Sequence, residues 1–221
     1  MPNQLIVALD VPNLDQARRT LDQLADTVRW FKVGLQLFTA AGPAVVRAVR
    51  ARGARVFLDL KFHDIPNTVA GAAQSAAALG VEMFNVHASG GEAMMRAAAE
   101  AAARMGADRP LVIAVTILTS QTASEADVLS LARAAKTSGL DGVVCSAREA
   151  VTLRRELGAD FKLVCPGIRP AWSETGDQKR IITPREAVQA GADYLVVGRP
   201  ILASPSPAAA ARRVLDEMHG G

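Results

Sequence analysis

Cysteine and aromatic residues are scarce in this chain of 221 residues. Only two cysteines occur, and phenylalanine, tyrosine and tryptophan together make up 4% of the sequence. Cys145 and Cys165 lie in separate apolar runs, GVVCS and KLVCPG. Two such cysteines exclude a disulfide framework and a cysteine-rich metal centre. They predict reduced core residues, and we therefore expect a reducing, cytoplasmic location.

Long hydrophobic runs and a strong excess of one charge are also missing. No stretch approaches the roughly 18 consecutive apolar residues of a membrane-spanning helix. No basic region precedes the first apolar run, in MPNQLIVALDV. We expect neither a membrane span nor export. The 25 basic and 22 acidic residues leave a net charge of +3, which is too small and too dispersed to indicate nucleic-acid binding.

Short apolar, β-branched runs are abundant and recur along the whole chain. They are continuous rather than alternating, as is typical of strands buried on both faces of a parallel sheet. Alanine-rich segments with helical periodicity separate them. The predicted strands are 5–10, 30–35, 56–61, 83–88, 111–118, 142–146, 162–168 and 194–201.

Eight alternating strand and helix units predict a (β/α)8 TIM barrel, close to the minimum length of this fold. An open, doubly wound sheet is the alternative that the pattern leaves. No linker or change of composition divides the chain, so residues 1–221 are expected to form a single domain. The one long irregular stretch is 169–182, and a loop of that length in a compact domain is usually functional.

Polar residues gather where these predicted strands end, which is where the site of such a barrel forms. They are Asp10, Asp59, Lys61, His87, Thr119, Arg169 and Arg199. Lys32 is the exception, because it lies inside the second predicted strand between apolar neighbours. An ammonium group is rarely buried alone, so Lys32 must be paired or have a role.

The stretch DLKFHDIPNT, residues 59–68, places two acids, a lysine and a histidine after the third strand. Asp59 and Lys61 are two positions apart, so both should point to the same side. Asp64 either returns to that place or projects toward another chain. With Lys32 from the adjacent strand, these groups form an alternating array that can stay charged at neutral pH. A purely structural ion-pair network is the alternative.

A second group of residues suggests a phosphate site. Gly198 and Arg199 end the eighth predicted strand and lead into the loop after it, and the sequence GDQKR (176–180) lies in the loop after the seventh. These two loops often bind phosphate in barrels of this kind. The alternative is that Gly198 and Arg199 only end a strand. His63 and His87 do not suggest a metal site, because Lys61 would repel a divalent cation beside Asp59.

The run LDLKFHDIPNTV resembles the signature of the orotidine 5'-monophosphate decarboxylase family, D-x-K-x-x-D-I-P-x-T after a hydrophobic strand. LIVALD, FKVGL, VTILTS, CPGIRP, GDQKR and DYLVVGRPI also stand in family order, so the resemblance covers essentially the whole chain. It implies decarboxylation of orotidine 5'-monophosphate to UMP in pyrimidine biosynthesis, with no cofactor and no metal.

The resemblance also implies roles for individual residues. Lys32, Asp59, Lys61 and Asp64 would form the catalytic array, with Lys61 protonating C6 of the pyrimidine as CO2 leaves. In a homodimer, Asp64 and Thr68 would reach into the partner's site. Asp10 would bind the ribose, Thr119 the pyrimidine, and the 169–182 loop would act as a lid. The remaining substrate-binding positions, mainly for phosphate, are Arg169, Gln178, Gly198 and Arg199.

Three other functions share parts of this pattern. A magnesium-dependent sugar-phosphate decarboxylase or aldolase resembles it closely, but such enzymes place a metal-binding carboxylate where this chain has Lys32. A Schiff-base aldolase would need a neutral Lys61, whereas flanking carboxylates favour the charged form. A non-catalytic sensor would bind UMP without turnover. The intact array favours the decarboxylase over all three.

Overall fold

The computed structural model describes residues 4–24, 26–118, 124–173 and 182–220. Eight parallel strands close into a barrel in which each strand pairs with the next along the chain and β8 pairs with β1. The strands are β1 (Gln4–Ala8), β2 (Trp30–Gly34), β3 (Arg55–Phe62), β4 (Met83–His87), β5 (Leu111–Val115), β6 (Gly142–Val144), β7 (Lys162–Cys165) and β8 (Tyr194–Val197). The predicted TIM barrel is therefore confirmed, and the open sheet is excluded.

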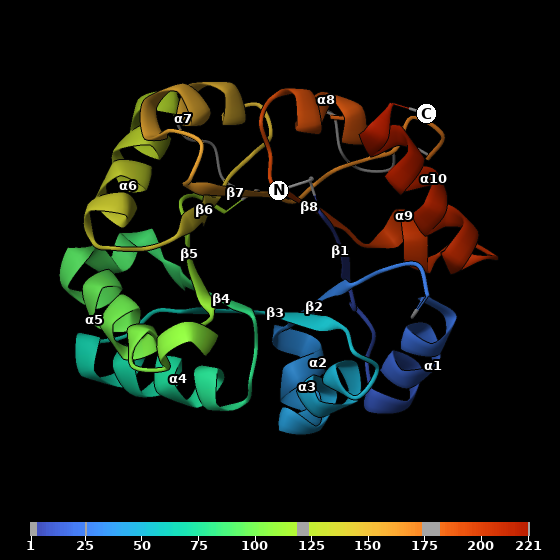
Figure 1. The fold of residues 1–221 in the computed structure, drawn as a ribbon, viewed down its shortest axis with the longest axis horizontal. Coiled ribbons are helices and arrows are strands. Elements are labelled where there is room, and N and C mark those ends of the chain that lie inside the picture. The colour runs from blue at the N-terminus through green and yellow to red at the C-terminus, as the bar shows by residue number, and fades with distance from the viewer. Residues whose placement is uncertain (1–3, 25, 119–123, 174–181, 221) are drawn as a thin grey trace.

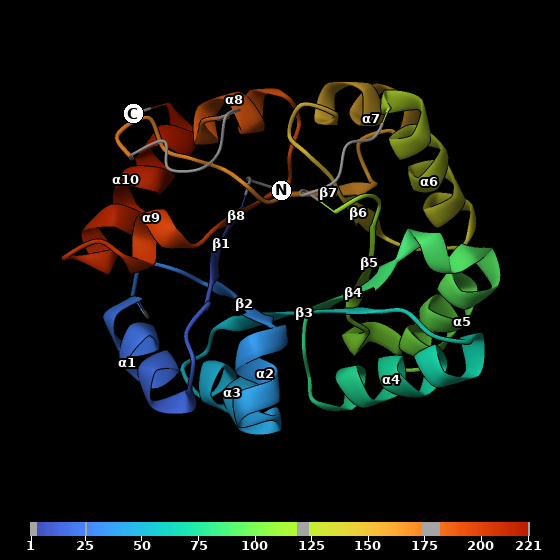
Figure 2. The ribbon, with the colours of Figure 1, turned by 180° about the vertical axis from the view of Figure 1, so that it is seen from behind.

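Helices form an outer ring around the strands, as Figures 1 and 2 show from opposite sides. Within the described residues they are α1 (Leu14–Leu24), α2 (Leu35–Ala41), α3 (Pro43–Arg50), α4 (Pro66–Ala78), α5 (Gly91–Ala103), α6 (Glu125–Thr137), α7 (Ala150–Leu157), α8 (Pro184–Gln189), α9 (Arg199–Leu202) and α10 (Pro207–His219), with 3-10 turns η1 (Ala88–Gly90) and η2 (Gly106–Asp108). None of these helices is both long enough and apolar enough to cross a membrane.

Two hydrophobic cores hold the barrel together. The larger lies between the sheet and the helices, and the smaller fills the interior of the barrel. Trp30, Phe57 and Met83 belong to the interior core. The residues two positions further along β2, β3 and β4 are polar, namely Lys32, Asp59 and Asn85. Because side chains alternate along a strand, these three polar groups lie one layer above an apolar floor.

The amino-terminal end of the barrel contains a repeated device. The residue before each of β4, β6 and β8 is acidic. It makes two hydrogen bonds with the second residue of the preceding strand. The backbone N–H of the acidic residue donates to the carbonyl of that strand residue, and the carboxylate accepts from the N–H of the same strand residue. The three pairs are Glu82 with Val56, Asp141 with Val112, and Asp193 with Leu163. An arginine lies beside each carboxylate: Arg50, Arg109 and Arg154. Backbone donors that have no strand partner are thereby satisfied.

The two cysteines lie side by side in the core, as expected of reduced residues. Cys145 follows β6 and Cys165 ends β7, both are free and buried, and their Sγ atoms are 3.8 Å apart. The hydrogen bond between the thiols, together with burial, raises the pKa of Cys145 well above its usual range. The thiol form is thus strongly favoured.

Candidate active site

Four charged side chains predicted from the sequence meet inside the carboxyl end of the barrel. The Lys32 Nζ atom lies 3.1 Å from Asp10 Oδ1 and 3.3 Å from Asp59 Oδ2, and the Lys61 Nζ atom lies 2.6 Å from Asp59 Oδ1. Acidic and basic groups therefore alternate in the order Asp10, Lys32, Asp59, Lys61. Lys32 is neither alone nor unpaired, which accounts for a lysine inside a buried strand.

Asp59 is the centre of this array and is only 9% exposed. Burial alone would raise the pKa of its carboxyl group. The positive charges of Lys32 and Lys61, with hydrogen bonds from Lys61 and Asn85, outweigh burial and lower the pKa. Asp59 is consequently ionised at neutral pH, and its charge is held between two ammonium groups.

Lys61 reaches Asp59 through an irregular backbone rather than the regular strand that its spacing suggests. Its φ is 53°, which makes it the one residue other than glycine with positive φ among the described residues. The pairing of β3 with β4 shifts between Leu58 and Phe62. The left-handed conformation costs a residue with a Cβ atom roughly 1 to 2 kcal/mol. Sequence reasoning had no signal for this, because lysine does not favour positive φ.

Two further residues shape the array and were missing from the prediction. Asn85 is 1% exposed and donates from Nδ2 to Asp59 Oδ1 at 2.7 Å. Gly34 lies two positions after Lys32, and a Cβ atom there would stand 2.9 Å from the Lys32 ammonium. Because glycine has no Cβ atom, this position leaves room for the Lys32 ammonium. The period-two pattern of β2 and β4 placed both residues on the interior face and could have indicated them.

Asp64 and Thr68 do not join the array within this chain. Asp64 lies in the loop after β3, where its Oδ1 accepts a hydrogen bond from the Ile65 N–H at 2.7 Å. Thr68 lies in the first turn of α4, and both residues are exposed. Between them, Ile65 exposes 66% of its surface. The structure brings together Lys32, Asp59 and Lys61, whereas the fourth predicted member stays outside this set of contacts.

The predicted phosphate residues lie beside one another at the ends of β7 and β8. Arg169 is 9% exposed, and burial together with the positive charge of Arg199 lowers the pKa of its guanidinium. Neither arginine has a carboxylate partner within the described ranges. Arg199 begins α9 and does not end β8, which stops at Val197, so that predicted boundary was wrong. Two neighbouring cations with no carboxylate partner among the described residues suit an anionic group.

The remaining predicted positions fall in different places. Gly198 precedes α9, and a Cβ atom there would lie 3.4 Å from Asp10 Oδ2, which brings the end of β8 close to the array. Thr119 and Gln178 lie outside the described residues. His87 ends β4, and its ring is 5.3 Å from that of His63. Burial, His63 and Lys61 lower the pKa of His87. Among the described residues, no three His, Cys, Asp or Glu side chains form a potential metal site.

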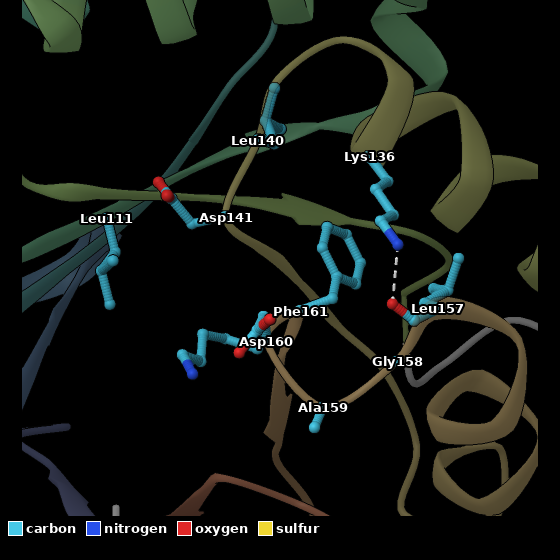
Figure 3. A pocket seen from close by; sticks show the side chains of 10 residues that line it. Leu111, Lys136, Leu140, Asp141, Leu157, Gly158, Ala159, Asp160 and Phe161 are labelled. Atoms are coloured by element: carbon cyan, nitrogen blue, oxygen red, sulfur yellow. Dashed lines mark hydrogen bonds between the residues drawn. The ribbon is translucent and has the colours of Figure 1, made fainter.

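A hollow of about 440 Å³ lies at the opposite, amino-terminal end of the barrel. Figure 3 shows that the end of α6 and the loops before β6 and β7 line it. Lys136 already donates to the Leu157 carbonyl across it at 2.7 Å. Because active sites of such barrels form at the carboxyl ends of the strands, the charged array and not this hollow is the candidate site.

A closed (β/α)8 barrel with this array at the carboxyl ends of its strands defines the class of the protein, a TIM-barrel enzyme. The chain belongs to the Orotidine 5'-phosphate decarboxylase / HUMPS family, whose model matches residues 3–214. The resemblance seen in the sequence is thereby confirmed.

Relatives and a solved structure extend the similarity over nearly the full length. The chain is 51% identical to "Orotidine 5'-phosphate decarboxylase" of Moorella thermoacetica, covering 98% of this chain and 92% of that one. It is 54% identical to the Vibrio vulnificus protein of the same name, covering 93% and 94%. The crystal structure of orotidine 5'-phosphate decarboxylase from Lactobacillus acidophilus matches with a TM-score of 0.86 at 39% identity, covering 98% and 99%.

Proposed function

We propose that the protein decarboxylates orotidine 5'-monophosphate to UMP without a cofactor. Family membership and relatives of this name at about half identity carry the assignment. The alternating array adds chemical support, because a lysine ammonium held against a buried carboxylate can balance charge as it forms on a pyrimidine carbon.

In the proposed reaction, the bond between C6 and the carboxyl carbon breaks and its electron pair stays on C6 as CO2 leaves. Lys61 then donates a proton from Nζ to C6, which yields UMP, and the neutral amine regains a proton from solvent. Asp59 holds the Lys61 ammonium in place beforehand, and Lys32 in turn holds Asp59. Little reorganisation is needed as charge moves, which is electrostatic preorganisation.

The rest of the substrate is assigned to the groups around the array. Arg169 and Arg199, with Gly198 and Gln178, would hold the phosphate. Although the phosphate is remote from C6, its binding energy would help to lower the barrier to reaction at C6. Asp10 would bind the ribose and Thr119 the pyrimidine. The exposed run from Asp64 to Thr68, which includes the exposed Ile65, supports a homodimer in which Asp64 and Thr68 complete the partner's site.

The decisive experiment follows the absorbance of orotidine 5'-monophosphate after addition of purified protein in excess EDTA. Conversion to UMP by the wild type and none by a folded Lys61→Ala variant is expected. Lys61→Ala should still bind UMP. No conversion by folded wild-type protein would refute the proposal, and conversion that requires added magnesium would refute its metal-free form. Retained turnover in Lys61→Ala would refute the role of Lys61.

A further inference from the structure

Asn85 occupies a place where the β3–β4 ladder is interrupted. Between the paired positions, β3 advances four residues, from Leu58 to Phe62, while β4 advances two, from Phe84 to Val86. Asp59, Leu60 and Lys61 therefore stand opposite the single residue Asn85. Such a bulge leaves backbone groups without ladder partners and re-aims the side chains that it carries.

The side chain of Asn85 replaces the missing ladder bond. Its Oδ1 accepts from the Lys61 backbone N–H at 2.8 Å, and its Nδ2 donates to Asp59 Oδ1 at 2.7 Å. The same Asp59 oxygen accepts from Lys61 Nζ at 2.6 Å. Three hydrogen bonds thus close a ring through Asn85, Asp59 and Lys61. The amide can take only this orientation, because a backbone N–H donates and an ionised carboxylate accepts.

The ring links the strained backbone of Lys61 to its functional group. A left-handed lysine persists only when its surroundings hold it there. Asn85 is buried and fixes both ends of the segment at once, the N–H of Lys61 and the carboxylate that the Lys61 ammonium contacts. Without it, Lys61 could relax toward an ordinary strand conformation, and its ammonium would move relative to Asp59.

We propose that Asn85 is a positioning residue that holds Lys61 and Asp59 in their reactive arrangement. It acts through these two residues and does not itself exchange a proton. The proposal rests on the decarboxylase function for its kinetic consequence. Its structural part, the bond from the Lys61 N–H to Asn85, stands independently of that function.

Three variants test it by kinetics. Asn85→Leu removes both hydrogen bonds at similar volume, and it is expected to lower kcat about 10- to 100-fold, the effect of losing hydrogen bonds to charged groups. The affinity for UMP should change less than about threefold, because Asn85 contacts the array and not the ligand. Asn85→Ser serves if Asn85→Leu fails to fold. Val86→Ala, on the opposite face of β4, controls for a general loss of packing.

Asn85→Asp gives a readout that a purely structural role would not move. When ionised, the introduced carboxylate still accepts from the Lys61 N–H but repels Asp59, whereas its protonated form donates to Asp59 as the amide does. Activity relative to wild type should therefore rise as the pH falls from about 8 to about 5.5. The titratable groups near this position are Lys32, Asp59, Lys61, His63 and His87. Dividing the activity of Asn85→Asp by that of wild type at each pH removes the contribution of these groups.

Hydrogen exchange of the Lys61 amide, measured by NMR, separates this inference from the proposed function. Asn85→Leu should speed exchange at Lys61 at least about tenfold, whereas Val86→Ala should leave it near the wild-type rate. Unchanged exchange, an unchanged kcat in folded Asn85→Leu, or a pH-independent activity ratio in Asn85→Asp would each overturn the proposal. Wild-type protein that converts no substrate refutes the decarboxylase assignment alone, and the exchange rates then decide the placement of Asn85.

Discussion

The ammonium group of Lys32 lies 3.3 Å from the carboxylate of Asp59, inside the barrel and above its apolar floor. Each group makes the burial of the other tolerable, because a buried charge without a partner costs several kcal/mol. Lys32 also contacts Asp10 at 3.1 Å, so it joins two carboxylates that come from different strand ends. The ionisation of Asp59 therefore depends on a residue from the neighbouring strand, far from it in the sequence.

Replacing Lys32 should shift the pH dependence of turnover. Lys32 lowers the pKa of Asp59, so Lys32→Met should raise it. If turnover requires ionised Asp59, activity is present above that pKa and lost as the pH falls through it. The acid limb of kcat/KM should therefore move to higher pH, and kcat at neutral pH should fall at least about tenfold. An acid limb at the wild-type pH would contradict this.

The matched control for that substitution is Lys136→Met. Lys136 also donates one hydrogen bond, to the Leu157 carbonyl, but at the amino-terminal end of the barrel. Its replacement removes the same charge and adds the same side chain far from the array. Wild-type pH dependence is expected for Lys136→Met.

Replacing Arg199 should weaken binding of nucleotides that carry a phosphate. Arg199→Ala is expected to cost about 1.5 to 3 kcal/mol in UMP binding, the worth of charged hydrogen bonds. Uridine, which lacks the phosphate, should bind both proteins equally. Arg212→Ala, an exposed arginine on α10, removes the same charge elsewhere. Calorimetric titration with UMP and with uridine measures these affinities. An equal loss of affinity for both ligands in Arg199→Ala would argue against a phosphate contact.

Mixing two inactive variants should restore activity if sites are shared between subunits. Asp64→Asn and Lys61→Ala should each be inactive alone. In a hybrid dimer, the Asp64→Asn chain supplies an intact Lys61 and receives an intact Asp64 from the other chain. The co-expressed mixture should show about a quarter of wild-type activity, because about half of the dimers are hybrids with one complete site of two, and hybrids purified through two affinity tags should show about half. Purified hybrids without activity would refute the shared site.

Much of the fold could be predicted because parallel strands buried on both faces leave continuous apolar runs. All eight runs became strands in the predicted order. Seven of the eight carboxyl ends were predicted too long, as in 111–118, which ends at Val115, and 194–201, which ends at Val197; the exception is 56–61, which ends at Phe62. Apolar residues continue past both ends, as Ile117 and Ile201 show, because they pack against the outer core. Apolar composition alone therefore overestimates strand length.

The site was predictable only where charge stood out against an apolar run. Lys32, Asp59 and Lys61 gave that signal, and they meet. Asn85 gave a weaker signal, because a single amide in the apolar run MFNVH does not by itself indicate a role. Its role becomes visible only when β4 is paired with β3. The left-handed Lys61 depends on tertiary contacts and left no mark on the sequence.

The repeated acidic residues at the amino-terminal end of the barrel should contribute to stability and not to turnover. Asp193 accepts from the Leu163 N–H at 2.8 Å and from Arg154 Nη2 at 2.6 Å. Arg154 in turn donates to the carbonyls of Gly158, Ala159, Phe161 and Gly191, and so ties together the turns before β7 and β8. Asp193→Ala leaves the Leu163 N–H without its acceptor and the Arg154 guanidinium without its carboxylate partner.

We expect Asp193→Ala to lower the free energy of unfolding by about 2 to 4 kcal/mol, the cost of unsatisfied and partly buried polar groups. Urea denaturation followed by circular dichroism measures it. Asp160→Ala, an exposed aspartate in the turn before β7, should change the midpoint little. The kcat of folded Asp193→Ala should match wild type, because the strands separate Asp193 from the array. Equal midpoints for the two variants would show that the repeated acid is dispensable.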